Sequence, residues 1–220
     1  MMKLSLITIL LTLIILVKCS SSKQFEKQKL KVSLYYETLC PFCMTFINDQ
    51  LYPGYQKLGD YLDLELIPYG NARRKKTDNG WTIECQHGPK ECVYNKIEAC
   101  GMARNVDQNA VISFVHCIEK GIKTDDSNYK RITKKCGPLL NVNTADIIKC
   151  AEGQEGDELM VANGVKTDAV QPSIDGVPTV LYNNYYNDTL EEYNDNFLTI
   201  ACKLLDDEPA ACMHLDNEIW

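Results

Sequence analysis

The sequence predicts an α/β protein in which a cysteine-rich helical segment interrupts a small sheet. Three observations support this fold class. Alternating apolar patterns typical of strands occur near both ends of the chain, a Cys-x-x-Cys motif follows the first of them, and six cysteines fall in the polar middle. The chain of 220 residues is long enough for one or two domains. Its eleven cysteines are more than a reducing compartment usually holds without a metal or redox role.

The N-terminus has the pattern of a secretory signal peptide. Lys3 precedes the uncharged stretch 4–17, and small residues follow. We expect cleavage to remove 1–22 and to leave a single domain over 23–220. The stretch is shorter than the roughly 20 residues of a membrane-spanning helix, and no later stretch is apolar enough, so no membrane span is expected. Removal of Cys19 leaves an even number of cysteines, which suits a paired disulfide framework in an oxidising compartment.

The first part of the mature chain predicts a strand, a helix and a second strand. Apolar and polar residues alternate over 32–36 and again over 62–66. Between these strands, a helix is expected to begin at Pro41, because proline suits the first helical turn and apolar residues then recur at helical spacing. The helix is expected to stop at Pro53 and its glycine neighbour.

The middle of the chain, from about 71 to 167, changes character and predicts an inserted helical subdomain. It is polar, and its apolar residues recur at helical rather than alternating spacing. One amphipathic helix is predicted over 110–118, and Thr144 is the expected cap of another. The basic run 73–76 is interpreted as a solvated loop rather than a nucleic-acid patch, because the formal charge of the whole chain is −7.

The last part of the chain predicts a hairpin and a closing helix. Alternation returns over 177–182, Asn183 and Asn184 favour a tight turn, and 190–205 reads as a helix. The order strand, Cys-x-x-Cys helix, strand, helical insertion, hairpin and helix is that of a thioredoxin fold interrupted after its second strand. The predicted fold is therefore thioredoxin-like, with a cysteine-rich helical insertion.

Cys40 and Cys43 are the candidate catalytic residues. A Cys-x-x-Cys pair at a helix start brings two sulfurs within bonding distance, and the free N–H groups and the helix dipole favour the thiolate of the first cysteine. Cys40 is the expected nucleophile toward a substrate disulfide, and Cys43 is expected to release the reduced substrate. The alternatives are an inert staple or half of a zinc site. The chain has no second Cys-x-x-Cys, so neither a metal nor another cofactor is expected.

Val177 and Pro178 are the candidate substrate-binding residues. In thioredoxin folds a cis proline at this position faces the redox pair and leaves neighbouring backbone free to pair with an extended substrate. Only about one X-Pro bond in twenty is cis in folded proteins, so a trans proline on an edge strand is the alternative.

The segment from Cys85 to Cys100 carries a specific resemblance. It matches the pattern Cys-Gln-His-Gly-x-x-Glu-Cys-x-x-Asn-x-x-x-x-Cys, which resembles the signature of the gamma-interferon-inducible lysosomal thiol reductase family. Shorter similarities extend the match over roughly 32–212. The resemblance implies a soluble thiol reductase that works on protein disulfides in acidic endosomes and lysosomes, with Cys40 and Cys43 as redox pair and Pro178 facing them. His87, within the signature, is interpreted as a residue that organises its own loop.

The other eight cysteines are expected to form four structural disulfides, of which only the pair Cys202 with Cys212 follows from spacing. They are Cys85, Cys92, Cys100, Cys117, Cys136, Cys150, Cys202 and Cys212. Asn187 begins the one N-glycosylation sequon and is an expected sugar site in a secreted chain.

The expected partners are disulfide-containing protein substrates and a small-molecule or protein thiol that supplies electrons, with no nucleic acid. The expected location is the secretory pathway, either secreted or in the lumen of endosomes and lysosomes. Two alternatives stay open: a secretory-pathway disulfide oxidase or isomerase, and a non-enzymatic binding protein held together by disulfides.

Overall fold

The computed structural model describes residues 28–78, 80–124, 128–186, 196–206 and 209–213. The signal peptide expected over 1–22 and the sequon at Asn187 lie outside these residues. None of the helices in the described part of the chain is long and apolar enough to cross a membrane.

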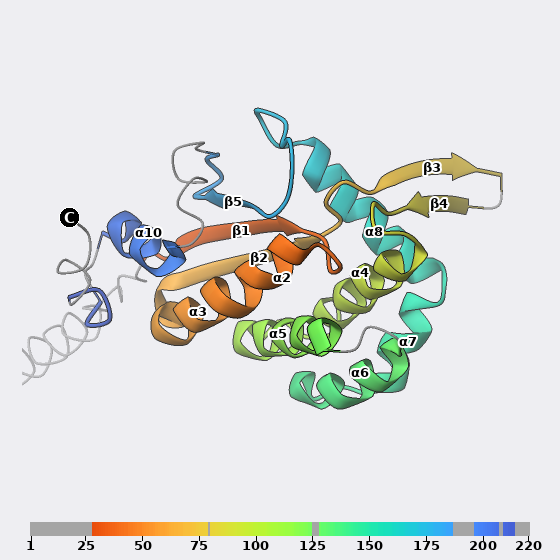
Figure 1. Cartoon of the computed structure of the whole chain (residues 1–220), viewed down its shortest axis with the longest axis horizontal. Helices are drawn as coiled ribbons and strands as arrows, with labels where there is room; N and C mark the ends of the chain where they lie inside the picture. The colour runs from red at the N-terminus through yellow and green to blue at the C-terminus, as the bar shows by residue number, and fades with distance from the viewer. Residues whose placement is uncertain (1–27, 79, 125–127, 187–195, 207–208, 214–220) are drawn as a thin grey trace, which may run out of the picture.

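A three-stranded sheet forms the centre of the fold (Figure 1). Its strands are β1 (Leu30–Tyr36), β2 (Leu62–Pro68) and β5 (Thr179–Tyr182), in the order β2-β1-β5. Leu34 in β1 lies opposite Leu66 in the parallel strand β2 and opposite Val180 in the antiparallel strand β5. The central strand is buried on both faces, so its end is a rigid platform for the loop that follows it.

A nearly continuous helical segment follows β1. It consists of α2 (Pro41–Thr45), the π-helix η1 (Phe46–Leu51), α3 (Tyr52–Leu58) and the 3₁₀ turn η2 (Gly59–Tyr61). The expectation that Pro53 and its glycine neighbour stop this helix is wrong. The N–H of Tyr52 donates to the carbonyl of Ile47, five residues back, so Pro53 enters in the first turn of α3, where its missing N–H costs little. Gly54 fits because a Cβ there would collide with the ring of Phe197.

The described part of the insertion holds five α-helices (Figure 1). They are α4 (Pro89–Met102), α5 (Gln108–Thr124), α6 (Tyr129–Cys136), α7 (Thr144–Ala151) and α8 (Gln154–Asp168), with the 3₁₀ turn η3 (Gly137–Leu140) after α6. Of these helices, α4, α5 and α8 contact the first helical segment or β2, and α6 and α7 pack on the other insertion helices. The amphipathic helix predicted over 110–118 lies within α5. The predicted cap of α7 is corrected: Asn143, not Thr144, is the N-cap, and its side chain accepts the N–H of Ala145 at 3.0 Å.

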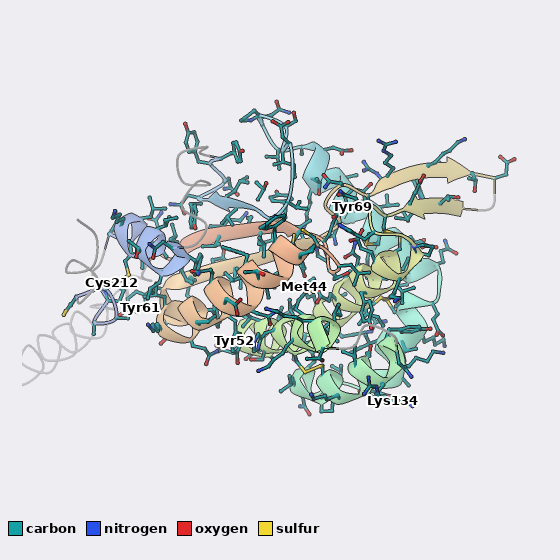
Figure 2. All side chains as sticks on the ribbon, viewed as in Figure 1. Met44, Tyr52, Tyr61, Tyr69, Lys134 and Cys212 are labelled. Carbon is teal, nitrogen blue, oxygen red and sulfur yellow. A yellow bond between two sulfur atoms is a disulfide. The ribbon has the colours of Figure 1, made fainter. Side chains whose placement is uncertain are left out.

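The start of the insertion is a hairpin, so the interpretation of 73–76 as a loop is wrong. Strands β3 (Arg73–Thr77) and β4 (Gly80–Glu84) pair antiparallel and extend away from the sheet (Figure 1). Most of their side chains are exposed, and apolar alternation therefore could not reveal them. Arg74 anchors the hairpin, because its guanidinium donates to Asp168 at 2.6 Å and lies over the ring of Tyr69, labelled in Figure 2.

The C-terminal part returns to the sheet and closes it. Asn183 and Asn184 take positive φ angles of 52° and 62° in the turn after β5, as their residue type favours. The closing helix is α10 (Phe197–Leu204), which packs on the first helical segment. The predicted helix over 190–205 overlaps it, and the part over 190–195 lies outside the described residues.

Four disulfides connect the described elements, and they use the eight described cysteines outside the Cys-x-x-Cys motif. The pairs are Cys85–Cys92, Cys100–Cys150, Cys117–Cys136 and Cys202–Cys212. The second joins α4 to α7 and the third joins α5 to α6, so the insertion is cross-linked internally. The last is the pair that spacing alone indicated, and Figure 2 labels Cys212 beside α10. Each such cross-link typically stabilises a fold by about 2–4 kcal/mol.

Candidate active site

Cys40 lies at the start of α2, after the short loop that follows β1. It is the N-cap residue, with an extended backbone (φ −70°, ψ 120°), and Pro41 occupies the first helical turn. Its Sγ accepts the N–H of Cys43 at 3.5 Å. Hydrogen bonding by Cys43 outweighs burial and lowers the pKa of the Cys40 thiol to about 6. The geometry therefore favours a thiolate at this helix start.

Cys43 has the opposite environment one turn further along. Its side chain is fully buried, and its Sγ accepts the N–H of Glu37 at 3.5 Å. Burial, together with the neighbouring Cys40 sulfur, raises the pKa of the Cys43 thiol far above its usual range. Among the described cysteines, only this one and Cys40 are outside disulfides. The motif thus combines an ionisable thiol with a sheltered, protonated one.

The Val177–Pro178 peptide bond is cis and lies against Cys40. The Cys40 thiol donates to the carbonyl of Val177 at 3.7 Å, which places the start of β5 across the redox motif. Phe42, between the two cysteines, is 76 % exposed. The Cys40 thiol thus lies against the backbone of Val177, and the adjacent helical turn carries an exposed aromatic ring.

His87 organises its own loop, as expected, and it also contacts Glu37 in the loop before the redox motif. Its N–H donates to Glu91 Oε1 at 3.2 Å, and its Nδ1 lies 2.5 Å from Glu91 Oε2. The same ring atom lies 3.5 Å from Glu37 Oε2, in the loop that leads to Cys40. Sequence patterns missed this proximity because 46 residues separate His87 from Cys40 in the chain, and no local periodicity reports a contact at that separation.

Glu37, His87 and Glu91 are the group of described side chains that could hold a metal ion. Two ligand atoms on a tetrahedral zinc ion lie roughly 3.3 Å apart, given zinc–ligand bonds of about 2 Å. The 2.5 Å between His87 Nδ1 and Glu91 Oε2 is instead a hydrogen-bond distance. The arrangement is that of a histidine between two carboxyl groups.

Other signature residues hold the loop in front of Cys40. The N–H of Thr38 donates to Asn95 Oδ1 at 3.1 Å, and its hydroxyl donates to the carbonyl of Glu91 at 3.4 Å. On the other side, the N–H of Asn71 donates to Glu37 Oε1 and its side-chain amide donates to Gln86 Oε1, both at 2.5 Å. The signature segment therefore holds Glu37 and Thr38, directly or through Asn71, in the loop before the redox motif.

A buried acidic group, which sequence analysis missed, lies behind Cys43. Glu98 on α4 and Glu119 on α5 are both fully buried, and the hydroxyl of Tyr36 donates to Glu98 Oε2 at 2.5 Å. Burial raises the pKa of Glu98 to about 8, and burial together with Glu98 raises the pKa of Glu119. These carboxyl groups keep protons at a pH where exposed ones are ionised.

Comparisons with known proteins agree with this geometry. The family model described as gamma interferon inducible lysosomal thiol reductase matches residues 31–140. The thiol reductase of this name from Carassius auratus is 37 % identical over 196 residues, 86 % of this chain and 74 % of that protein. The corresponding protein from Mus musculus is 35 % identical over 179 residues, 79 % of this chain and 67 % of that protein.

Solved structures show the same fold at low sequence identity. MdbA of Actinomyces oris, a thiol-disulfide oxidoreductase, has a TM-score of 0.56 at 14 % identity, with 83 % of each chain covered. DsbA of Chlamydia trachomatis has a TM-score of 0.54 at 16 % identity, covering 80 % of this chain and 92 % of its own. The thioredoxin-like fold predicted from the sequence is confirmed. With homologues that are thiol reductases, the chain is a thiol-disulfide oxidoreductase, and it belongs to the gamma-interferon-inducible lysosomal thiol reductase family.

Proposed function

We propose that this protein reduces disulfide bonds of protein substrates through Cys40 and Cys43, in an acidic endosomal or lysosomal lumen or outside the cell. The observation that carries the proposal is the contrast between the two thiols. Cys40 has a pKa of about 6 at a helix start, whereas Cys43 is buried and protonated beside it. A reductase needs two thiols of different reactivity, because one must attack the substrate disulfide while the other stays protonated until the mixed disulfide has formed.

The reaction has two exchange steps. The Cys40 thiolate attacks one sulfur of the substrate disulfide, the S–S bond breaks, and the second sulfur leaves and takes a proton. The Cys43 thiol then loses its proton and attacks Cys40 in the mixed disulfide, which releases the second substrate thiol. The substrate gains two electrons and two protons, and the Cys40–Cys43 disulfide holds the oxidised equivalents. A small-molecule or protein thiol restores the reduced pair.

Substrate binding is proposed at Val177, Pro178 and Phe42. Pro178 has no N–H to donate, and the chain beside it approaches Cys40, so an extended peptide can lie along this backbone. Phe42 offers an exposed apolar contact for an unfolded substrate. Folded proteins conceal their disulfides, and acidic media loosen many of them, which favours substrates in an acidic compartment.

The proposed compartment is supported by the sequence and by relatives named as lysosomal. The leader expected over 1–22 directs the chain into the secretory pathway, and one thioredoxin-like domain over 23–220 is what remains. A sugar on Asn187 is part of this proposal. Lysosomal delivery and secretion are both compatible with it.

The test is insulin reduction with dithiothreitol at pH 4.5 and pH 7. The native protein is expected to accelerate reduction at both values, and at pH 4.5 the uncatalysed background is small because ordinary thiols are protonated there. Cys40→Ser is expected to abolish the acceleration, whereas Cys43→Ser is expected to accumulate mixed disulfides with insulin. Acceleration that survives Cys40→Ser would refute the mechanism. A measured reduction potential as oxidising as that of a disulfide oxidase would refute the direction.

A further inference from the structure

The loop between β1 and α2 connects His87 to both cysteines through one residue. The carbonyl of Glu37 accepts the N–H of Cys40 at 3.4 Å, and the N–H of Glu37 donates to Cys43 Sγ at 3.5 Å. The side chain of the same residue is fully buried and faces His87 Nδ1 at 3.5 Å. His87, by contrast, is one-third exposed, with 34 % of its side chain accessible. A change in charge at His87 or Glu37 should therefore change the electrostatic potential at Cys40 and Cys43.

The charged and titratable neighbours of this loop come from three directions. Glu91 in the first turn of α4 pairs with His87, and the Asn71 amide binds the other oxygen of Glu37. Cys40 itself interacts electrostatically with both Glu37 and His87. Behind the motif lie the buried carboxyl groups of α4 and α5, Glu98 and Glu119. His87 is the basic side chain of this group.

We propose that His87 is a positioning residue for the Cys40 thiolate: its cationic ring, held between Glu37 and Glu91 and connected to the redox motif through Glu37, favours ionisation of Cys40 in acid. The proposal rests on the function proposed above and assigns a role to the His-Gly-x-x-Glu part of the signature. It identifies His87 as the positive charge that favours the Cys40 thiolate in acid.

The protonation states support this role. Burial, followed by the charge of Glu91, raises the pKa of Glu37 to about 7, so this carboxyl is neutral at pH 5. Although desolvation lowers the pKa of His87, the hydrogen bond that its ring donates to Glu91 raises this pKa overall, so the ring is cationic there. In acid the cationic ring thus faces a neutral Glu37. Above about pH 7 the ionised Glu37 adds a negative charge, which opposes the thiolate.

The test measures how the alkylation rate of Cys40 by iodoacetamide depends on pH, with the labelled peptide quantified by mass spectrometry. His87→Gln removes the charge, and it is expected to raise the labelling midpoint by half a unit to one unit. Labelling at pH 5 then falls about three- to tenfold, because one pKa unit is a tenfold change in thiolate. His87→Lys keeps a charge and is expected to remain within about twofold of the native rate. Glu37→Gln is expected to leave the midpoint at or below the native value.

The matched control is His116→Gln. His116 stacks on Tyr52 with ring centroids 3.7 Å apart, and its electrostatic neighbours are Lys120 and Asp49, not Cys40. Its labelling profile is expected to superimpose on the native one. The proposal is overturned if folded His87→Gln labels at pH 5 within twofold of native, or if His87→Lys loses as much as His87→Gln. It is also overturned if Glu37→Gln raises the midpoint.

Two features keep this result interpretable. Near-ultraviolet circular dichroism of each variant separates a charge effect from misfolding, and if His87→Gln does not fold, Glu37→Gln and His87→Lys decide the question. Alkylation needs no substrate protein, so a normal Cys40 profile without insulin reduction would refute the proposed function and leave this inference standing. Insulin reduction by the native protein, together with unchanged Cys40 labelling profiles in the His87 variants, would refute this inference and leave the proposed function standing.

Discussion

Raising the pH from 5 to 7 should destabilise this protein, and the cause lies in the buried carboxyl groups. In the unfolded chain a glutamate ionises near pH 4.3. In the fold, burial raises the pKa of Glu98 to about 8 and also raises that of Glu119. Between these values the folded state keeps protons that the unfolded state has lost. By linkage, the free energy of unfolding falls as pH rises through this window, and the protein is most stable in acid.

The size of the effect follows from the number of protons retained. Each retained proton lowers the free energy of unfolding by about 1.4 kcal/mol per pH unit, so a single carboxyl accounts for about 3 kcal/mol between pH 5 and pH 7. For a domain of this length, 1 kcal/mol corresponds to about 2–4 °C in melting temperature. The expected decrease is therefore about 6–12 °C if Glu98 and Glu119 together retain one proton, and larger if both stay neutral.

Other groups act in the same window and determine the design of the assay. The pKa of Cys40 is lowered by hydrogen bonding from Cys43, so its ionisation stabilises the fold as pH rises and opposes the effect. Melting is therefore measured in Cys40→Ser, by circular dichroism at pH 5, 6, 7 and 8 and constant ionic strength. Glu37 and His87 have raised pKa values and contribute in the same direction as the buried pair, whereas burial lowers the pKa of His116, which opposes it.

Glutamine substitutions isolate the buried pair. Glu98→Gln with Glu119→Gln, added to Cys40→Ser, removes both titrations and is expected to flatten the dependence of melting temperature on pH. Glu152→Gln is the matched control, because Lys130 lowers the pKa of this exposed carboxyl and it titrates below the window. A melting temperature that stays constant or rises from pH 5 to pH 7 in Cys40→Ser would refute the reasoning. An undiminished slope in the variant without both carboxyls would refute the assignment.

Two further predictions concern the cysteines and the loop. Mild reduction followed by alkylation is expected to label Cys40 and Cys43 well before the eight cysteines in disulfides, and uniform labelling of all ten by mass spectrometry would contradict the redox assignment. Gly70→Ala is expected to lower stability by about 1–3 kcal/mol in urea unfolding, because Gly70 has a φ of 55° and an added Cβ would collide with the buried side chain of Glu37; an unchanged unfolding midpoint would contradict this packing.

The fold was largely predictable because its central elements follow simple periodicity. The three strands and the start of α2 at Pro41 are visible in the sequence, since apolar alternation and proline position depend on local geometry. The continuation of the first helical segment past Pro53 was not visible in the sequence, because the π-helix before it rearranges backbone hydrogen bonds without any signal in side-chain polarity. The exposed hairpin β3–β4 was hidden for a related reason, since charged side chains mask its alternation.

The candidate site was predictable only in part. Cys40, Cys43 and Pro178 follow from motifs, but the cis state of the Val177–Pro178 bond does not. Glu98 and Glu119 were overlooked because ionisable residues are rarely buried. A signal for the second was present: Glu119 follows Val115 by four residues and precedes Ile122 by three, so it falls within the apolar stripe of α5. The approach of His87 to Cys40 had no such signal, since it depends on how α4 docks against the end of β1.

The proposed chemistry and the predicted stability depend on the same protons. In each exchange step a negative charge forms on Cys40 or on Cys43, and both Glu37 and Glu119 interact electrostatically with this redox pair. When these carboxyl groups are protonated, the thiolates form beside neutral neighbours; when they ionise, the neighbours repel the thiolates and the buried charges weaken the fold. Ionisation of these carboxyl groups should therefore oppose thiolate formation and lower the free energy of unfolding over the same pH range. Acidic side chains are normally harmful near a thiolate, but in acid these two are compatible with the proposed redox pair because they hold protons there.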